Sequence, residues 1–177
     1  MKTLVLEKFK CLIDNDGDDS DSPYFVCFVG HPSFDFVVTM STVFLEHLDD
    51  TVASTGAWTE VNEQIVREVV DDKTFVLVAL LERDDGIDLT DEEVTALRER
   101  MVGKWLQIAR DEHVHGDRLV KRMRKEFRRA INSHTNNDDL IGIRHLPIPS
   151  SGQPAHLLIE NDPDDGSYTV AFRLTAK

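Results

Sequence analysis

The sequence has little cysteine, no long apolar run and fewer basic than acidic residues. No stretch approaches the roughly 18 to 20 apolar residues that span a bilayer, so we expect no transmembrane segment. The run from Met1 to Lys8 is too short for a secretory signal, which predicts a cytoplasmic protein. With 20 Lys and Arg against 33 Asp and Glu, the net charge is −13. That excess of negative charge argues against general nucleic-acid binding.

The two cysteines, Cys11 and Cys27, flank an acidic segment. They would lie opposite each other if that segment closed a hairpin, and a disulfide would then be feasible. We predict buried free thiols instead, because two thiols in a cytoplasmic protein are usually reduced and cysteine packs as a small apolar residue.

Common catalytic motifs are also missing. There is no Gly-x-Ser-x-Gly elbow, phosphate loop or His-Glu-x-x-His. Carboxylates are abundant, but nothing in the sequence selects one pair for acid–base chemistry. The segment Glu112 to His115, with Asp111 and Asp117 beside it, has metal-ligating side chains but falls in a predicted helix–helix turn, so we interpret it as surface. We therefore expect a non-enzymatic protein with no catalytic residues.

Apolar patterning predicts strands in the first half of the chain. Residues 3–13 alternate as a strand, with an irregularity near Phe9 that suits a bulge. Residues 24–30 are continuously apolar, which is typical of a strand covered on both faces. Residues 34–40 predict a third strand, and 74–81 a buried one.

Two segments between these strands are ambiguous. Residues 42–58 include the apolar run Val43 to Leu45, which fits a short strand followed by a loop. Residues 60–70 carry valine and isoleucine at spacings that fit either a helical turn or a strand.

The pattern then changes to helices. Thr90 and Glu93 form a capping box, and apolar residues at three- and four-residue steps predict an amphipathic helix to about Glu112. Asp117 can cap a second helix, which residues 132–137 end. Strands resume over residues 140–148, 155–159 and 167–174. The fold class that follows is mainly β: a single-domain antiparallel β-sandwich of residues 1–85 and 138–177, with a helical hairpin inserted at 86–137.

Two acidic clusters are the best indication of function. The first is Asp14-Asn15-Asp16-Gly17-Asp18-Asp19-Ser20-Asp21, and the second ends in Asp138-Asp139-Leu140-Ile141-Gly142. Carboxylates this close repel one another, and a hard cation with oxygen ligands such as Ca²⁺ relieves the repulsion. Zinc would favour His or Cys, which these segments lack. The alternative is that they are solvated turns without metal.

The same segments resemble motifs of the C2-domain family, the calcium- and phospholipid-binding β-sandwich modules. Ser20-Asp21-Ser22-Pro23-Tyr24 is similar to the family's Ser-Asp-Pro-Tyr with one residue added. The Val-rich run before Glu82-Arg83-Asp84-Asp85, and Asp139-Leu140-Ile141-Gly142, resemble its third loop. Leu146-Pro147-Ile148 stands where Leu-Pro-Leu is frequent. The resemblance implies a C2-like Greek-key sandwich whose third loop contains the helical insertion.

The resemblance also implies a set of calcium ligands. Asp21 matches the first-loop Asp, with Asp16 or less readily Asp14 as its partner in that loop. Glu82 and Asp84 match the acidic pair of the third loop, where the family usually has Asp at the position of Glu82. The implied Ca²⁺ ligands are Asp14, Asp16, Asp21, Glu82, Asp84 and Asp139.

The predicted second helix is strongly basic. Asp117 to Arg129 holds seven basic and two acidic residues, a net charge of +5 that leaves −18 for the rest of a chain whose total is −13. Such a helix can lie on an anionic membrane. We favour a helix whose apolar face packs on the sandwich or on the first helix, with its cations paired to the acidic body.

Two functions follow from these features. The leading one is a C2-like binding module that binds Ca²⁺ at one end of the sandwich and docks on a protein or on an anionic membrane. The alternative is a metal-free structural protein that uses the helical hairpin as an oligomer or partner interface. Met101, Trp105 and Met123 would then be the anchor residues.

Overall fold

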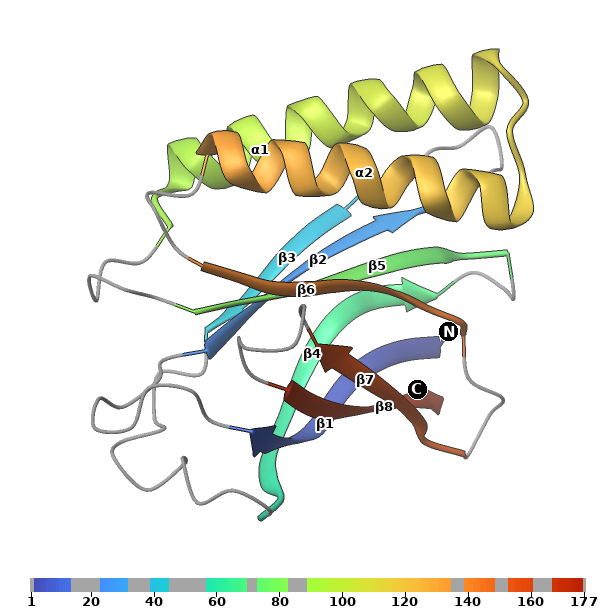
Figure 1. Ribbon diagram of the computed structural model, residues 1–177. Helices are drawn as coiled ribbons and strands as arrows, with labels where there is room; N and C mark the ends of the chain where they lie inside the picture. Colours follow the sequence, from blue (N-terminus) through green and yellow to red (C-terminus); the bar gives the residue numbers. More distant parts are fainter. Residues whose placement is uncertain are drawn as a thin grey trace.

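The chain folds into two packed antiparallel sheets with a pair of helices on one of them (Figure 1). The computed structural model describes residues 2–13, 23–31, 39–44, 57–69, 73–82, 89–134, 139–148, 153–160 and 167–176. The strands are β1 (Lys2–Ile13), β2 (Pro23–Gly30), β3 (Thr39–Phe44), β4 (Thr59–Val69), β5 (Phe75–Glu82), β6 (Asp139–Leu146), β7 (Ala155–Glu160) and β8 (Ser167–Ala176). The helices are α1 (Asp91–Trp105), the π-helix η1 (Leu106–Asp111) and α2 (Gly116–His134).

The strand order confirms the predicted mainly-β sandwich. Sheet I runs β4-β1-β8-β7 and sheet II runs β3-β2-β5-β6, and every pairing is antiparallel. After β2 and β3 in sheet II, β4 returns to lie beside β1, which is a Greek-key connection. The helices interrupt the chain between β5 and β6, which are neighbours in sheet II, so the helical pair is an insertion within one sheet.

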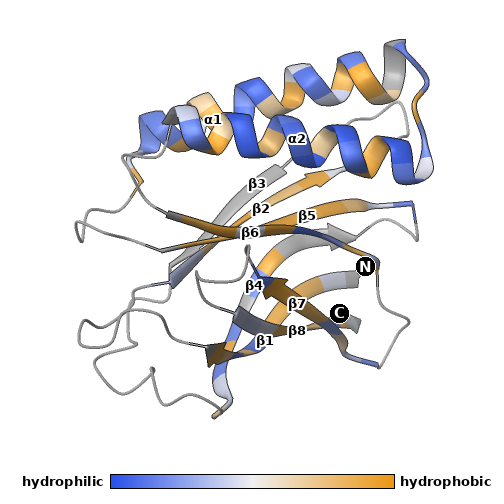
Figure 2. Cartoon of the chain, in the orientation of Figure 1, coloured by the Kyte–Doolittle hydropathy of each residue, from blue (hydrophilic) through white to orange (hydrophobic). Residues whose placement is uncertain are grey.

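The central strands of sheet II, β2 and β5, are buried on both faces. Along β2, Phe25, Cys27 and Val29 pack into the core between the two sheets. The alternate residues Tyr24 and Phe28 belong to a second core beneath the helices. All eight residues of β2 are buried, which confirms the prediction from its continuous apolar run. Figure 2 shows the resulting three layers, with hydrophobic residues where the helices face sheet II.

An aromatic cluster joins the helices to sheet II. The ring of Phe28 lies 6.5 Å from Phe75, 5.9 Å from Trp105 and 6.4 Å from Phe127, measured between centroids. Gly30 makes the approach of α1 possible, because a Cβ there would stand 2.9 Å from Cε2 of Trp105. The end of β2 therefore needs a residue without a side chain under the indole.

The helix boundaries follow their capping signals closely. The backbone N–H of Glu93 donates to Thr90 Oγ1 at 3.2 Å, and the backbone N–H of Thr90 donates to Glu93 Oε2 at 2.8 Å, so the predicted capping box is present. The second helix begins at Gly116, one residue before the predicted Asp117 cap. Gly116 has φ +58°, a conformation that glycine adopts without a steric cost.

Several strand expectations need correction or resolution. The third strand is β3 over Thr39–Phe44, whereas residues 34–40 were expected, of which 34–38 lie outside the described residues. The ambiguous segment 60–70 forms a strand, β4. The irregularity expected near Phe9 is present as register shifts between Leu6 and Lys8 against both β4 and β8.

The structure confirms that the two cysteines are buried free thiols, and it excludes a hairpin that would place them opposite each other. β1 pairs with β4 and β8, whereas β2 pairs with β3 and β5, so the two strands lie in different sheets. Cys11 and Cys27 are both buried free thiols.

The prediction that three residues anchor an assembly interface is wrong. Met101 and Met123 are fully buried and Trp105 is 1% exposed, all in the core between the helices and sheet II. Their helical spacing reflects packing within the chain, since the outer face of sheet II needs an apolar cover. In the described part of the chain, no helix is long and apolar enough to cross a membrane.

We predict that Phe28→Ala destabilises the fold by about 3–5 kcal/mol, the usual cost of emptying a buried aromatic site. The loss arises because Phe28 contacts both helices and β5. Urea unfolding followed by circular dichroism measures it. Leu158→Ala is the matched control, because Leu158 on β7 is 45% exposed. It should change stability by no more than about 0.5 kcal/mol, and an equal loss in both variants would contradict the proposed role of Phe28.

Candidate functional site

The register of sheet II aligns the ends of three acidic segments: the two acidic clusters of the sequence and the run that begins at Glu82. Pro23, which follows the first acidic cluster, is the cross-strand partner of Glu82. Glu82, which precedes residues 83–88, is in turn the partner of Asp139. Neighbouring strands lie about 4.7–4.9 Å apart, so the three backbones stand within about 10 Å at one end of sheet II. Segments far apart in sequence are thus anchored side by side, at what we call the acidic end.

The six predicted calcium ligands are only partly described. Asp14, Asp16, Asp21 and Asp84 lie outside the described residues. Glu82 and Asp139 face each other across the β5–β6 ladder as backbone partners. Among the residues that the structure describes, no three His, Cys, Asp or Glu side chains are grouped so as to hold a metal. The ligand set therefore stays a prediction, and the backbone register is the observation that bears on it.

The histidines between the two helices are surface residues, as expected. His113 and His115 are both exposed, and neither belongs to a metal-binding group in the described chain. The neighbouring Glu112 forms an ion pair with Arg122 of α2. The hydrogen bond from Arg122 lowers the pKa of Glu112. This carboxylate therefore ties the turn to α2.

Neither cysteine thiol is a candidate nucleophile. Burial raises the pKa of Cys27 to about 12, whereas a reactive thiol needs a pKa near or below neutrality. Cys11 is 4% exposed. Both side chains act as apolar packing in the core between the sheets.

We predict that Cys27 resists alkylation in the native protein at about pH 8. The thiol remains protonated there, and its contribution to stability, present below about pH 9, is lost as the pH rises toward the folded-state pKa of about 12. Mass spectrometry after N-ethylmaleimide treatment should show labelling only when guanidinium unfolds the chain. Native labelling as fast as that of the unfolded chain would contradict this assignment.

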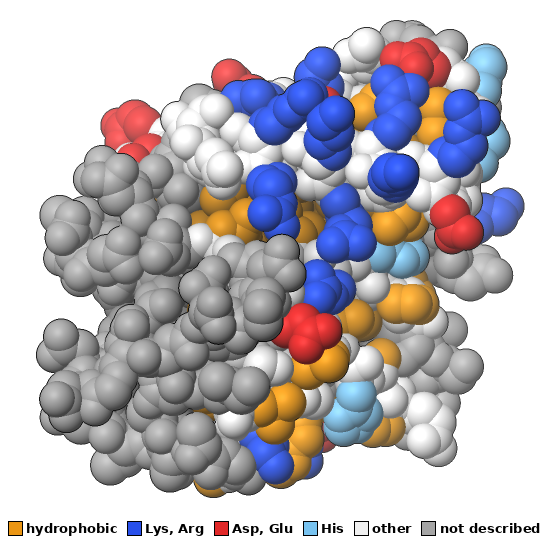
Figure 3. Space-filling model, viewed as in Figure 1, with side chains coloured by type: hydrophobic (Ala, Val, Ile, Leu, Met, Phe, Trp, Pro, Cys, Tyr) orange, Lys and Arg blue, Asp and Glu red, His pale blue; other side chains and the backbone are white. Residues whose placement is uncertain are grey.

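The exposed face of α2 carries most of the positive charge that the sequence indicated. Figure 3 shows Lys and Arg side chains gathered along this helix. Arg122 pairs with Glu112, and Arg129 pairs with Glu126 at 2.7 Å. In the described parts of the chain, Lys121, Arg124, Lys125 and Arg128 form no ion pair. Glu112 and Glu126 both belong to the helical insertion, so among the described residues these ion pairs join α2 to itself and to the turn before it, and the expected pairing with the acidic sandwich is not seen.

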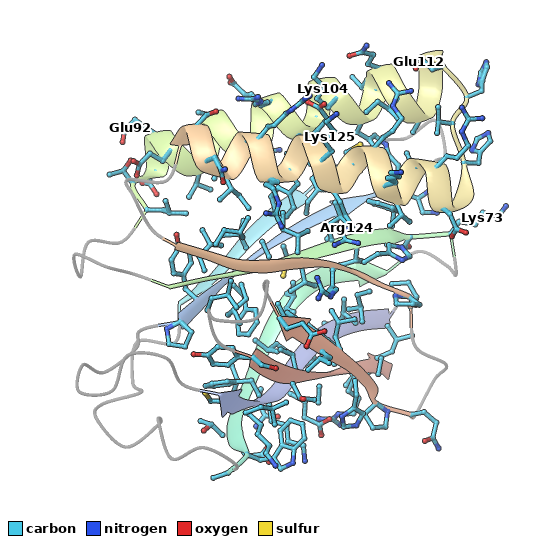
Figure 4. The ribbon with its side chains drawn as sticks, in the orientation of Figure 1. Lys73, Glu92, Lys104, Glu112, Arg124 and Lys125 are labelled. Carbon is cyan, nitrogen blue, oxygen red and sulfur yellow. The ribbon has the colours of Figure 1, made fainter. Side chains whose placement is uncertain are left out.

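Four cations of α2 line a groove between this helix and β6, which we call the cationic groove. It has a volume of about 530 Å³, and its walls are Asp117, Val120, Lys121, Arg124, Lys125, Arg128 and Ile143. Arg124 extends from α2 toward the sheet (Figure 4). Its pKa is lowered by partial burial and then by the nearby charges of Arg144 and Arg128. Positive groups are thus held close together, an arrangement that an anion would stabilise.

Arg144 on β6 is a positive charge near Arg124 that sequence reasoning missed. The β5–β6 register shifts at Ile141, so strict alternation along β6 fails there. Arg144 is therefore paired with Val78, which packs in the core between the two sheets, and lies on the face of β6 away from the helices. Arg144 Nη2 donates to the backbone oxygen of Glu160 at 3.0 Å, which links the edges of the two sheets.

A second hollow, which we call the end cavity, lies where the turn between η1 and α2 faces the start of β5 and the end of β6. It has a volume of about 830 Å³. Its walls are His31, Lys73, Thr74, Phe75, Trp105, His115, Gly116, Asp117, Leu119, Val120, His145, Pro147 and Ile148. Its place at the opposite end of β5 from Glu82 separates it from the acidic end. No motif in the sequence indicated this cavity, because its walls come from five separate segments.

Comparison with known proteins gives a likeness of fold. No protein-family model and no curated protein matches the chain. Solved structures that align with it include "Structure of a C2 domain", with 9% identity, a TM-score of 0.45 and 99% of both chains covered. A C2 domain of plant Extended Synaptotagmin 1 aligns with 10% identity, a TM-score of 0.46, and 99% and 94% coverage. Human GIVD cytosolic phospholipase A2 aligns at 12% identity and a TM-score of 0.37, over 99% of this chain and 17% of the enzyme.

Proposed function

We propose that the protein is a non-enzymatic binding module that takes up Ca²⁺ at the acidic end and docks on an anionic phospholipid surface. The observation that carries the calcium proposal is the register that puts Pro23, Glu82 and Asp139 in one line across three strands. Each of these residues adjoins one of the acidic segments of the sequence. This register supports a site to which carboxylates from all three segments contribute.

The proposed mechanism is electrostatic. Ca²⁺ takes six to eight oxygen ligands at 2.3–2.6 Å and tolerates irregular geometry, which suits carboxylates contributed by several segments. Asp14, Asp16, Asp21, Glu82, Asp84 and Asp139 are the proposed ligands. Binding would neutralise charges that otherwise repel one another, and it would make the local field attractive to anions.

The basic face of α2 supports an anionic partner. Among the described residues, no acidic side chain forms an ion pair with Lys121, Arg124, Lys125 or Arg128. A basic residue close to an anionic membrane contributes about 1 kcal/mol to binding. Attraction acts over about a Debye length, roughly 8 Å at physiological salt, so this face can bind anions although the whole chain is acidic. The oligomer interface is less well supported, since its proposed anchors are buried.

We predict that Ca²⁺ stabilises the protein through the acidic end. At millimolar Ca²⁺ the thermal midpoint should rise by several degrees relative to chelator, because ligand binding to the folded state adds to its stability. The double variant Asp21→Asn and Asp139→Asn should lose this response. Glu99→Gln on the exposed face of α1 is the matched control and should keep it. A midpoint that is the same in Ca²⁺ and in chelator would refute the calcium proposal.

We predict that Arg128→Gln weakens binding to vesicles containing phosphatidylserine about fivefold, because one cation contributes about 1 kcal/mol. Co-sedimentation at several salt concentrations measures the effect. Arg98→Gln removes the same charge from an exposed position on α1 and should bind as the unmodified protein does. Equal losses in the two variants would point to net charge alone and would contradict a specific docking face on α2.

A further inference from the structure

The cationic groove and the end cavity adjoin each other. Asp117 and Val120 line both of them. Figure 3 shows the basic side chains of α2 beside hydrophobic side chains between this helix and β6, with histidine and further hydrophobic side chains toward the end of β6. The two hollows therefore meet at Asp117 and Val120, and we call the pair the trough: one part is cationic, and the other is lined in large part by apolar side chains.

The end cavity suits an apolar chain. Phe75, Leu119, Pro147 and Ile148 supply much of its wall. His145 is half-buried, and its pKa is lowered chiefly by that burial, against the opposing effect of Asp117. The imidazole is therefore largely neutral at pH 7. The charged side chains of this cavity, Lys73 and Asp117, are exposed, and its buried polar residues, His31 and Thr74, already interact with other groups of the chain.

One buried donor in the wall has no acceptor. Trp105 lines the end cavity, and its Nε1 is covered and makes no hydrogen bond to any residue that the structure describes. A buried N–H without a partner is uncommon in folded proteins. The π-helix η1 begins directly after Trp105, and such irregular turns are frequent at functional sites. Because Nε1 is covered, a ligand that reached it would have to displace part of the wall, which should alter the surroundings of the indole.

We infer that this trough binds a single-chain anionic amphiphile, with its phosphate head in the cationic groove and its hydrocarbon chain in the end cavity. The proposal builds on the anionic role given above to α2, and it requires neither Ca²⁺ nor a bilayer. Arg124 and Arg128 lie four and eight residues beyond Val120, which is about 6 and 12 Å along the helix. A head group held by these two arginines thus leaves room for a chain directed past Val120.

The carboxylate of Asp117 should determine which way the ligand lies in the trough. It stands at the junction of the two hollows and repels an anion there, so the head group is driven toward Arg124 and Arg128. Removing this carboxylate should therefore strengthen binding of the anion, and the change alters the net charge of the protein by only one. Loss of Arg124 should do the opposite.

Isothermal titration with n-octyl phosphate, below its micelle concentration and without Ca²⁺ or vesicles, tests the inference. Inorganic phosphate supplies the head alone, and octan-1-ol the chain alone. We expect n-octyl phosphate to bind at least tenfold more tightly than either.

Tryptophan fluorescence gives a second readout. The protein has two tryptophans, so in a Trp58→Phe background the emission of Trp105 reports on the end cavity and should change on binding. Binding no tighter than that of octan-1-ol or of phosphate would overturn the inference.

Three variants locate the ligand. Arg124→Gln should weaken binding of n-octyl phosphate about tenfold, the usual effect of losing a charge-assisted hydrogen bond. Asp117→Asn should strengthen it about threefold, as expected for removing one nearby like charge. Arg98→Gln should leave it unchanged, and an unchanged affinity in Arg124→Gln would overturn the inference. Vesicle binding without n-octyl phosphate binding would reject the trough alone, whereas n-octyl phosphate binding without a Ca²⁺ response would reject only the calcium proposal.

Discussion

The burial of β2 and β5 on both faces is the constraint on which the rest of the structure depends. Alternate residues of β2 serve two cores, one between the sheets and one beneath the helices. Apolar burial contributes roughly 25 cal/mol per Å², so these two strands of sheet II fix the positions of both neighbouring layers. They hold the apolar face of α2 inward, which leaves most of its cations exposed, while Arg124 extends toward the sheet. The cationic groove and the end cavity both lie along the margin of that contact.

Much of the fold could be predicted from local patterns, and the failures have physical causes. The capping box at Thr90 predicted the start of a helix, and the continuous apolar run of β2 predicted a strand covered on both faces. Residues 60–70 allowed no such choice between helix and strand, because the spacing of Val61, Ile65 and Val69 fits a helical and an extended period equally. The buried Trp105 resembled an interface anchor for a related reason: its spacing shows that it is covered, but it does not identify what covers it.

The candidate site divides in the same way. Sequence order identified the acidic segments, and their strand neighbours suggested which end of the sandwich they occupy. Only the register, Pro23 with Glu82 and Glu82 with Asp139, brings their anchoring backbones together. The trough was beyond sequence reasoning, because its walls come from strands and helices whose adjacency depends on tertiary packing. Arg144 shows this most directly, since an irregular register decides where it lies.

The position of the helical insertion has a consequence for the stability of the sandwich. The insertion begins after Glu82 and ends before Asp139, which are directly paired, and loop closure becomes only slowly less favourable as a loop lengthens. The length of the insertion therefore weakens the pairing of β5 with β6 little. Its removal is a different matter, because excision would expose Tyr24, Phe28 and Leu77 to water. A chain cut back to the two sheets would present a contiguous apolar face, and such faces favour aggregation.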